Sequence, residues 1–299
     1  MGRATAVKIN SEILPNKKDI CIVARDATNN LIAPIENIKV LLLVGGKGTR
    51  LSSVSGDISK GLITIDQDGK ISGTEHSSMI LKNLELNDVV LLVRHKSDQY
   101  IEFAEKHGYA ILHQNEESGT GGALEEAIAE FGADKQYLVM ATDTYLYATD
   151  VARLLSAHSI GNVTWGVSIR NPDLDMDSYY GLVLDSQNNV IGDVKQHWWH
   201  NYSVDQIQLV TKGAVQIVDP MLYLHSVKIF KKLAGNPSAI DLYWDIMPLM
   251  EEQNRRRINK GQNSVVKGVI FDHDIIDYGT PERLAITRAR YDIASTKRD

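Results

Sequence analysis

Three continuous apolar runs in the first half of the chain are separated by more polar segments. The runs are residues 39–44, 88–93 and 136–141. A run that is apolar at every position is typical of a strand buried on both faces, as in a parallel sheet covered by helices. Residues 98–106 and 122–131 have the spacing of amphipathic helices. This alternation of strands and helices predicts an α/β fold with right-handed crossovers.

The pattern changes after Asp150, where apolar and polar positions begin to alternate. Residues 163–169 alternate between apolar and polar positions. Further along, the polar residues 186–189 separate two short apolar runs, 181–184 and 190–191. Two short runs with a polar turn between them are typical of a β-hairpin, so we expect antiparallel strands to be added to the sheet. The complete pattern predicts one three-layer α/β domain with a mixed central sheet.

Residues 1–37 precede the first predicted parallel strand and have a pattern of their own. Residues 19–23 and 31–35 are apolar and flank Asn29 and Asn30, which indicates a second hairpin. We expect residues 1–37 to form an accessory hairpin or leader before a domain of residues 38–299. No chemistry is evident in this leader.

Composition excludes several classes of protein. The hydrophobic share of 43% and the charged share of 23% are near those of soluble globular proteins. No run reaches the roughly 18 apolar residues of a membrane-spanning helix, and residues 1–12 lack the apolar segment of a secretory signal. The single cysteine, Cys21, excludes an internal disulfide. We therefore expect a cytoplasmic protein with no membrane partner.

The formal net charge of −6 argues against a nucleic-acid partner, because binding to phosphate backbones needs clustered Lys and Arg. Residues 255–260 form the densest basic patch. We interpret this patch as the solvated end of a helix.

A glycine-rich turn follows the first apolar run, in the sequence LVGGKGTRL of residues 43–51. Glycine permits positive φ and close backbone approach, so successive N–H groups can point at a phosphate. Arg50 adds a bidentate donor for phosphate oxygens. Turns of this kind also occur where nothing binds. This one has neither the spacing of the dinucleotide fingerprint nor the G-K-[ST] ending of a P-loop.

The segment GGKGTRL resembles the signature of the sugar-nucleotide pyrophosphorylases, also called nucleoside-diphosphate-sugar synthases. That signature continues to a lysine ten residues after the arginine, and Lys60 stands there in this chain. Further segments follow in the family's order from about residue 39 to 285. The resemblance implies a Rossmann-like, GT-A-like nucleotidyltransferase fold, with a nucleotide-binding half at about 38–150 and an acceptor-binding half at about 151–299. It also implies transfer of a nucleotidyl group from a nucleoside triphosphate to a sugar 1-phosphate, with Mg²⁺ as cofactor and pyrophosphate as product.

The resemblance extends to the segment ESGTGGAL of residues 117–124, which is similar to the family's loop for base and ribose. Gln114 occupies the position whose side chain contacts the base edge; an amide fits guanine, uracil or thymine. GTGGAL is most similar to guanylyltransferases acting on mannose or heptose phosphates, which favours GTP. The alternative for this segment is an ordinary connection before a helix. The implied nucleotide-binding residues are Leu43, Gly45, Gly46, Gly48, Thr49, Gln114, Gly119, Thr120 and Gly121.

Two aspartates are candidate ligands of Mg²⁺. Asp143 ends the third apolar run, and ligands collect at the carboxyl ends of strands in open α/β sheets. Such an aspartate alone is more often a helix cap, but the resemblance makes it the family's first metal ligand. Asp277, in the sequence DYGTPE, resembles the aspartate of the family's second metal segment. We expect the neighbouring Asp272 and Asp274 to be exposed to solvent.

The implied mechanism needs no general base, because a phosphate nucleophile is already anionic at neutral pH. Arg50 and Lys60 would hold the reacting phosphates and the leaving pyrophosphate, since catalysis of this transfer consists mainly of positioning and charge neutralisation. The catalytic set implied by the resemblance is Arg50, Lys60, Asp143 and Lys195.

The acceptor side departs from the family's pattern. Tyr180 and Gly181 resemble its Tyr-Gly-Val strand, but Lys195 lies one residue short of the family's lysine and lacks the preceding glutamate. Lys212 stands in the segment where the family has Asn-Ala-Gly. Trp198 lies in a predicted loop, where it could stack on an acceptor ring or simply join the core. The acceptor residues we expect are Tyr180, Gly181, Lys195, Trp198 and Lys212.

Three alternatives stay open beside this reading. One is a cytidylyl-, uridylyl- or thymidylyltransferase with an unusual phosphorylated acceptor. Another is a catalytically silent regulatory homologue. The third is a nicotinamide-dependent oxidoreductase, which residues 94–96 (Arg-His-Lys) disfavour, because an acidic ribose-binding residue is expected there. Homo-oligomers are usual in a family of this kind.

Overall fold

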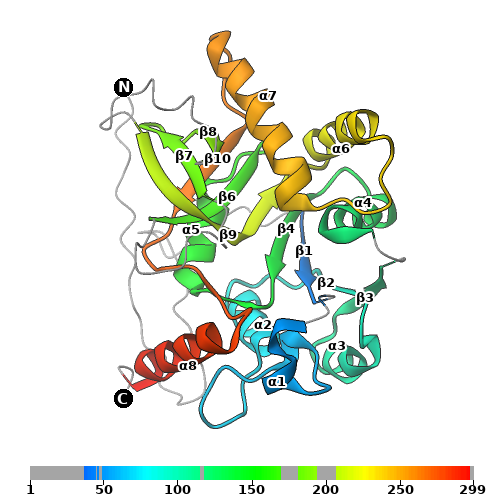
Figure 1. The fold of residues 1–299 in the computed structure, drawn as a ribbon, viewed down its shortest axis with the longest axis vertical. Coiled ribbons are helices and arrows are strands. Elements are labelled where there is room, and N and C mark those ends of the chain that lie inside the picture. The colour runs from blue at the N-terminus through cyan, green and yellow to red at the C-terminus, as the bar shows by residue number, and fades with distance from the viewer. Residues whose placement is uncertain are drawn as a thin grey trace.

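The computed structural model describes most of the chain in one α/β structure (Figure 1). The described residues are 37–44, 46, 49–114, 118–169, 181–193 and 207–296. The expected accessory hairpin of residues 1–37 lies almost entirely outside this range.

The first half of the chain supplies four parallel strands. They are β1 (Ile38–Leu43), β2 (Val89–Val93), β3 (Ala110–His113) and β4 (Gln136–Ala141), arranged side by side as β4-β1-β2-β3. β1, β2 and β4 are the three predicted apolar runs. β3 was not predicted, because its ends are exposed and its middle is only half buried, so it lacks a continuous apolar pattern.

The second half adds strands of mixed direction. β9 (Ile207–Val218) runs antiparallel to β4 on one side and to β6 (Val163–Ile169) on the other, and β10 (Val266–Ile270) lies parallel to β6. The predicted hairpin is present as β7 (Gly181–Asp185) and β8 (Val190–Asp193), with β7 paired to β9. The main path of the sheet is therefore β10-β6-β9-β4-β1-β2-β3, and the prediction of a mixed central sheet is confirmed.

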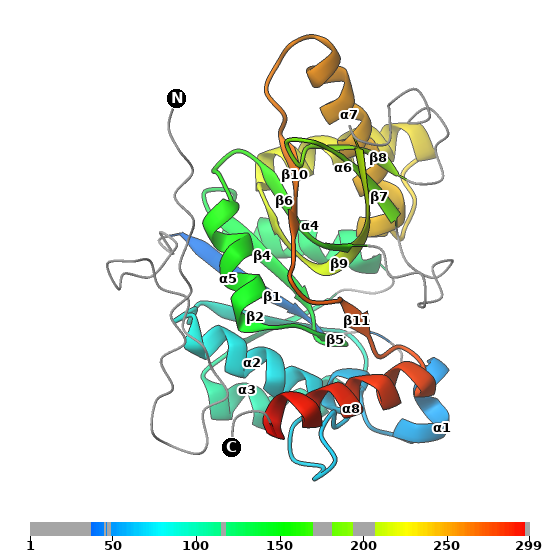
Figure 2. The same cartoon turned by 90° about the vertical axis from the view of Figure 1, so that its left-hand side faces the viewer.

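Helices cover both faces of the sheet, which completes the three predicted layers (Figure 2). One face packs against α2 (Gly73–Asn83), α3 (Ile101–His107) and α5 (Ala148–Ala157). The other face packs against α4 (Gly119–Phe131), α6 (Pro220–Ala234) and α7 (Met247–Asn259).

The alternation of side chains explains why apolar residues follow one another along the parallel strands. Val40 and Leu42 point into the core on the α2 side, whereas Leu41 points into the core on the α4 side. All three are completely buried. The middle of a strand between two helical layers has no solvent-facing position, so the polar residues Lys39 of β1 and Gln136 of β4 stand near the beginnings of their strands.

Two predicted helices differ at their N-terminal ends. Residues 97–100 form a 3₁₀ turn before α3 rather than its first turn. α4 begins at Gly119, three residues before the predicted start, and the Gly121 amide in its first turn donates to the carbonyl of Ile240 at 2.8 Å. The basic residues from Arg255 lie in the last turns of α7, as expected for a helix end.

The C-terminal segment returns to the carboxyl end of β4. β11 (Ile276–Asp277) pairs antiparallel with β5 (Thr144–Tyr145), and α8 (Pro281–Thr296) follows. α8 lies beside α1 (Ser52–Ser55) in both ribbon views (Figures 1 and 2). In the described part of the chain, no helix combines the length and apolarity needed to cross a membrane.

Candidate active site

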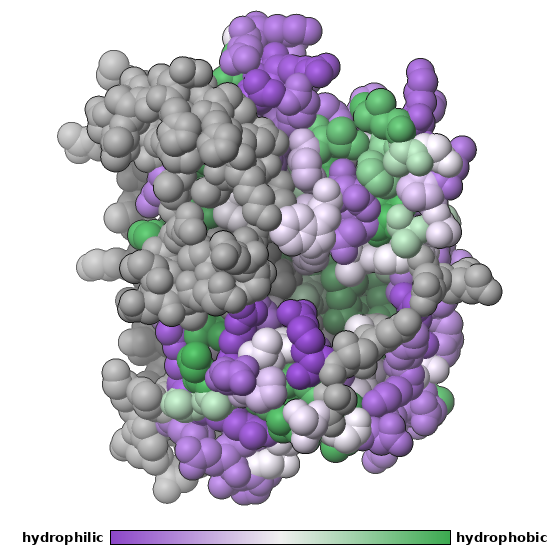
Figure 3. Space-filling model, viewed as in Figure 1, coloured by the Kyte–Doolittle hydropathy of each residue, from purple (hydrophilic) through white to green (hydrophobic). Residues whose placement is uncertain are grey.

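A cavity of about 500 Å³ opens at the carboxyl ends of β1, β2 and β4. The molecular surface is visibly hollowed at the centre of this face, with hydrophobic residues on the floor of the hollow (Figure 3). In open α/β sheets this edge is where ligands bind, because the loops that follow the strands meet there. The cavity is therefore our candidate active site.

Residues from distant parts of the sequence gather in this cavity. Those predicted as site residues that line it are Leu43, Gly46, Arg50, Lys60, Gln114, Gly119, Thr120, Asp143 and Asp277. The prediction that these residues share one site agrees with their placement.

The other predicted residues are placed differently. Gly121 is buried in the first turn of α4, where a Cβ would come within 2.8 Å of the Ile240 side chain, so this glycine permits close packing. Gly181 pairs with Thr211 between β7 and β9, and Lys212 pairs with Val167 between β9 and β6. Thr49 begins the 3₁₀ turn that contains Arg50. Gly45, Gly48, Tyr180, Lys195 and Trp198 lie outside the described residues.

Lys60 forms an ion pair with Asp143 across 83 residues of sequence. The side chains are 14% and 29% exposed, so solvent screens the pair less than a surface ion pair. Lys60 begins a short 3₁₀ helix, Lys60–Leu62. Both members line the cavity, which places an ammonium and a carboxylate at the end of β4.

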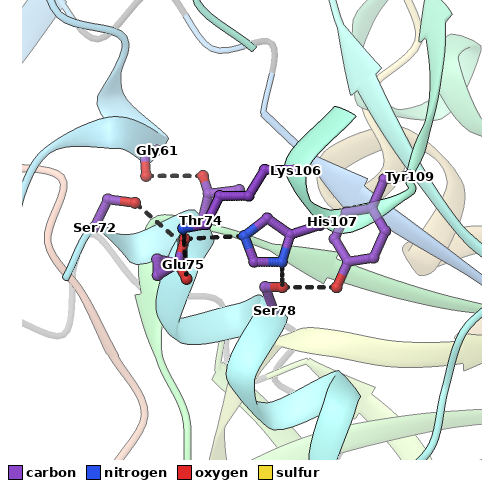
Figure 4. Close-up of polar contacts among 8 residues, drawn as sticks. All are labelled: Gly61, Ser72, Thr74, Glu75, Ser78, Lys106, His107 and Tyr109. Atoms are coloured by element: carbon purple, nitrogen blue, oxygen red, sulfur yellow. Dashed lines mark hydrogen bonds and ion pairs between the residues drawn. The ribbon is translucent and has the colours of Figure 1, made fainter. Parts of the chain in front are cut away.

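A polar network on α2 holds the Lys60 turn in place (Figure 4). Thr74 donates from Oγ1 to the carbonyl of Gly61 at 2.8 Å. One turn further, His107 of α3 contacts Glu75 at 3.1 Å and Ser78 at 2.9 Å. The turn carrying Lys60 is thus tied to α2, and α2 is tied to α3, so the ammonium has a rigid support.

Asp143 and Asp277 are brought together by the small β5–β11 sheet. The amide of Tyr278 donates to the carbonyl of Asp143 at 2.9 Å, and Asp277 is the register partner of Thr144. The two aspartates therefore lie on adjacent backbone segments. Of the other acidic residues nearby, Asp272 is exposed, as predicted, whereas Asp274 is half buried and paired with Arg290.

Gly279 marks the point at which the charged groups converge. A Cβ at this position would lie 2.6 Å from Asp277 Oδ1, 3.2 Å from Lys60 Nζ and 3.6 Å from Arg50 Nη2. Any side chain here would displace at least one of these three groups. The glycine of the DYGTPE segment is therefore required by crowding of the site.

The donor set suits a hard cation such as Mg²⁺. Mg²⁺ is usually held by one or two carboxylates, with water and substrate phosphates as the remaining ligands. Asp143 and Asp277 supply two carboxylates next to cationic groups that suit phosphates. No group of three or more His, Cys, Asp or Glu residues suited to a metal occurs in the described ranges, so the protein's own share of such a site would be these two carboxylates.

Gln114 lies at the other end of the cavity, after β3. Its Nε2 donates to Ser118 Oγ at 2.8 Å and to the carbonyl of Gly119 at 2.7 Å. Because a backbone carbonyl can only accept, the amide nitrogen must face Gly119. The group with which Gln114 would contact a base is therefore its carbonyl oxygen.

A segment that the sequence did not single out forms another wall of the cavity. The lining residues are Tyr243 and Trp244 of the short π-helical turn Leu242–Ile246, and Asp241, which caps this turn. Thr120 donates from Oγ1 to Asp241 Oδ2 at 3.2 Å and accepts from the Leu242 amide at 2.9 Å. No local motif signals this wall, because its contacts with α4 span more than a hundred residues.

Burial raises the pKa of the Tyr243 phenol, and the carboxylates of Asp143 and Asp241 raise it further. The phenol is therefore neutral at physiological pH. Its neighbour Trp244 also lines the cavity and is 53% exposed, so an aromatic face borders the cavity.

Two arginines complete the lining. Arg94 follows β2, where it was considered only as evidence against nicotinamide binding, and Arg283 lies in the first turn of α8. Arg283 Nη1 donates to Asp277 Oδ2 at 2.8 Å. Its place shortly after the DYGTP segment is a signal that sequence reasoning missed.

Comparison with known proteins agrees with this geometry. The family model described as Nucleotidyl transferase matches residues 39–196. The chain belongs to this family. The resemblance stated from the sequence is thereby confirmed, and the oxidoreductase alternative is wrong.

Two curated relatives match parts of the chain. Bifunctional protein GlmU of Leifsonia xyli is 32% identical over 131 residues, which is 42% of this chain and 26% of GlmU. The chain thus spans about a quarter of GlmU. Choline-phosphate cytidylyltransferase of Streptococcus pneumoniae is 22% identical over 219 residues, which is 70% of this chain and 82% of that enzyme.

Solved structures share the fold at low sequence identity. The inositol-1-phosphate CTP transferase of T. maritima has a TM-score of 0.64 at 17% identity, covering 89% of this chain and 97% of its own. HddC of Yersinia pseudotuberculosis has a TM-score of 0.61 at 20% identity, covering 85% of this chain and 99% of its own. The predicted Rossmann-like nucleotidyltransferase fold is confirmed.

Proposed function

We propose that this protein transfers a nucleotidyl group from a nucleoside triphosphate to a phosphorylated acceptor, with Mg²⁺, and releases pyrophosphate. The observation that carries the proposal is the convergence of Arg50, Lys60 and Asp277 on Gly279, with Asp143 paired to Lys60. Together with membership of the nucleotidyl transferase family, this charge arrangement favours phosphate chemistry at the carboxyl edge of the sheet.

In the proposed reaction, an oxygen of the acceptor phosphate attacks the α-phosphorus of the triphosphate. A new P–O bond forms, and the bond from the α-phosphorus to the oxygen bridging to the β-phosphorus breaks. The electron pair of that bond leaves with pyrophosphate. Arg50 and Lys60 orient the phosphates for in-line attack and stabilise the charge that develops on the leaving group.

The charge of the described site explains why a metal ion is proposed. Arg50, Lys60, Arg94 and Arg283 carry four positive charges, and Asp143, Asp241 and Asp277 carry three negative charges. The single net positive charge is too small to balance a triphosphate and an acceptor phosphate. Mg²⁺, held by the two aspartates, would supply the missing positive charge and align the phosphates.

GTP is our proposed donor. The GTGGAL segment resembles that of guanylyltransferases, and guanine has N–H donors for the Gln114 carbonyl. HddC, whose fold is similar, was solved with GMP-PN. CTP is the second candidate, because the match to choline-phosphate cytidylyltransferase extends over 70% of this chain and cytosine also has an N–H donor.

The acceptor proposed from the sequence is a sugar 1-phosphate. Residues of about 38–150 would bind the nucleotide, and those of about 151–299 would bind the acceptor. Trp244 belongs to this second half of the chain and lines the cavity, where it is 53% exposed. An exposed indole at this position suits stacking against a ring on the acceptor.

The test is pyrophosphate release with Mg²⁺, measured for GTP, CTP, UTP, dTTP and ATP against a panel of acceptors. The panel contains sugar 1-phosphates, inositol 1-phosphate and phosphocholine. We expect turnover with GTP and a sugar 1-phosphate. Turnover with CTP alone would replace the donor assignment, and absence of pyrophosphate from every pair with folded protein would contradict the proposal.

A further inference from the structure

Both carboxylate oxygens of Asp277 receive donors from the same short segment of chain. Oδ1 accepts from the amide of Gly279 at 2.9 Å, and Oδ2 accepts from Nη1 of Arg283 at 2.8 Å. The side chain of Arg283 is 11% exposed, and that of Asp277 is 26% exposed. Solvent therefore screens this ion pair less than it screens a pair on the surface.

These two donors determine the orientation of the carboxylate. Asp277 ends β11, a strand of two residues, so its backbone alone gives little support. A carboxylate oxygen has two lone pairs, and each donor occupies one of them. Each oxygen has a second lone pair, so Asp277 could hold a cation while Gly279 and Arg283 orient its carboxylate.

Asp143 is supported in a different way. Its partner Lys60 belongs to the phosphate-binding set, and Lys60 Nζ lies close to the Gly279 position that Arg50 also approaches. A bound phosphate therefore competes with Asp143 for the Lys60 ammonium. Arg283, by contrast, belongs to α8, so its backbone is held by the helix.

We infer that Arg283 is the positioning residue of Asp277 and that it sets the affinity of the site for a divalent cation. This inference rests on the proposed function, because that function makes Asp277 a metal ligand. Hydrogen-bond partners of metal ligands typically affect metal affinity by 10- to 100-fold. The planar guanidinium, which donates from Nη1 to Oδ2, directs this hydrogen bond more firmly than a flexible ammonium would.

The experiment is a titration of the full-length protein with Mn²⁺, followed by electron paramagnetic resonance of the free ion, without any nucleotide. Arg283→Gln should raise the apparent Kd about 10- to 100-fold. Arg283→Lys should fall between this variant and the wild type, since it keeps the charge and one donor. Arg288→Gln is the matched control, because Arg288 lies on the same helix and binds the carbonyl of Thr64; it should bind as the wild type does.

The outcomes separate this inference from the proposed function. Asp277→Asn should abolish the binding that the wild type shows. If Asp277→Asn abolishes binding but Arg283→Gln and Arg283→Lys both bind like the wild type, the inference about Arg283 is overturned and the metal site stands. If Arg283→Gln binds Mn²⁺ more tightly, the arginine competes with the cation and the inference is overturned. Absence of Mn²⁺ binding in the wild type would overturn both.

Discussion

The parallel and antiparallel halves of the sheet build the candidate site in different ways. β1, β2 and β4 run in one direction, so the loops after them meet at one edge and bring their residues together. β9 runs against β4, with Val215 opposite Met140 and Val218 opposite Tyr137. The beginning of β9, rather than its end, therefore lies toward the cavity edge.

This difference shows why the nucleotide side is recognisable in sequence and the acceptor side is not. In the parallel half, the glycine-rich turn and Asp143 each follow an apolar strand. On the other side, the lining comes from the Asp241–Trp244 segment and from residues around Asp277, which reach the cavity from outside the strand ends. We therefore expect the nucleotide to be recognised by the parallel half and the acceptor by the other half, with the catalytic carboxylates shared between them.

The largest effect is expected at the shared carboxylates. Asp143→Asn should lower kcat roughly 100- to 1,000-fold, because it removes a charge from the point at which both halves meet. Pyrophosphate release and melting temperature should be measured together, since the variant should stay folded. Asp272→Asn is the control, because this exposed residue pairs with Arg153 outside the cavity lining.

A smaller loss is expected from Gly279→Ala. The added Cβ would meet Asp277 Oδ1 at 2.6 Å and would approach Lys60 Nζ to 3.2 Å. We expect kcat/KM to fall about tenfold or more, which corresponds to about 1.4 kcal/mol. Unchanged kcat/KM would show that the site accommodates the methyl group without disturbing Asp277.

The division between the halves is tested by Trp244→Ala. Loss of a stacking contact worth about 0.5–1.5 kcal/mol should raise the KM of the acceptor by several-fold and leave the KM of the nucleotide unchanged. Gln114→Ala is the matched opposite variant and should raise only the nucleotide KM. If both variants affect the same substrate, the division is wrong.

The smallest expected effect is on the pH dependence of stability, at His158, which joins the two halves of the sheet. His158 contacts Gln136 of β4 at 3.2 Å and Thr164 of β6 at 2.9 Å. Burial lowers the pKa of His158 to about 4, despite the opposing charge of Asp219. The unfolded chain therefore binds more protons than the folded protein between pH 4 and the ordinary histidine value of about 6.5, so stability falls as pH falls through this window.

Replacement of His158 by Asn should flatten this part of the pH dependence. Urea unfolding between pH 4 and 7.5 gives the free energy of unfolding, and its slope with pH should be lower in the variant. An equal slope in both proteins would show that His158 does not contribute to the loss of stability at low pH.

The sequence predicts much of the parallel half because each signal there is local. β1, β2 and β4 are buried on both faces, so each contains at least four consecutive apolar residues. β3 escapes detection because it lies at the sheet edge with exposed ends. The hairpin of β7 and β8 is predicted from the polar turn between its strands.

The missed part of the site depends on contacts between distant residues. Asp241 reaches the cavity through Thr120, 121 positions earlier, and Trp244 follows it. Arg283 faces Asp277 because α8 begins directly after the DYGTP segment. Charge and residue type alone do not distinguish Arg283 from Arg288, whose side chain turns toward Thr64.

The central claim is that the protein joins the acceptor phosphate to the α-phosphorus of a nucleoside triphosphate, and detection of this new bond tests it most directly. Phosphorus NMR of a reaction containing protein, Mg²⁺, GTP and a sugar 1-phosphate distinguishes the possible products. We expect resonances of pyrophosphate and of a diphosphate that joins nucleoside to sugar, both formed roughly 100- to 1,000-fold more slowly with Asp143→Asn. Orthophosphate as the only product, or equal rates with the wild type and Asp143→Asn, would contradict this mechanism.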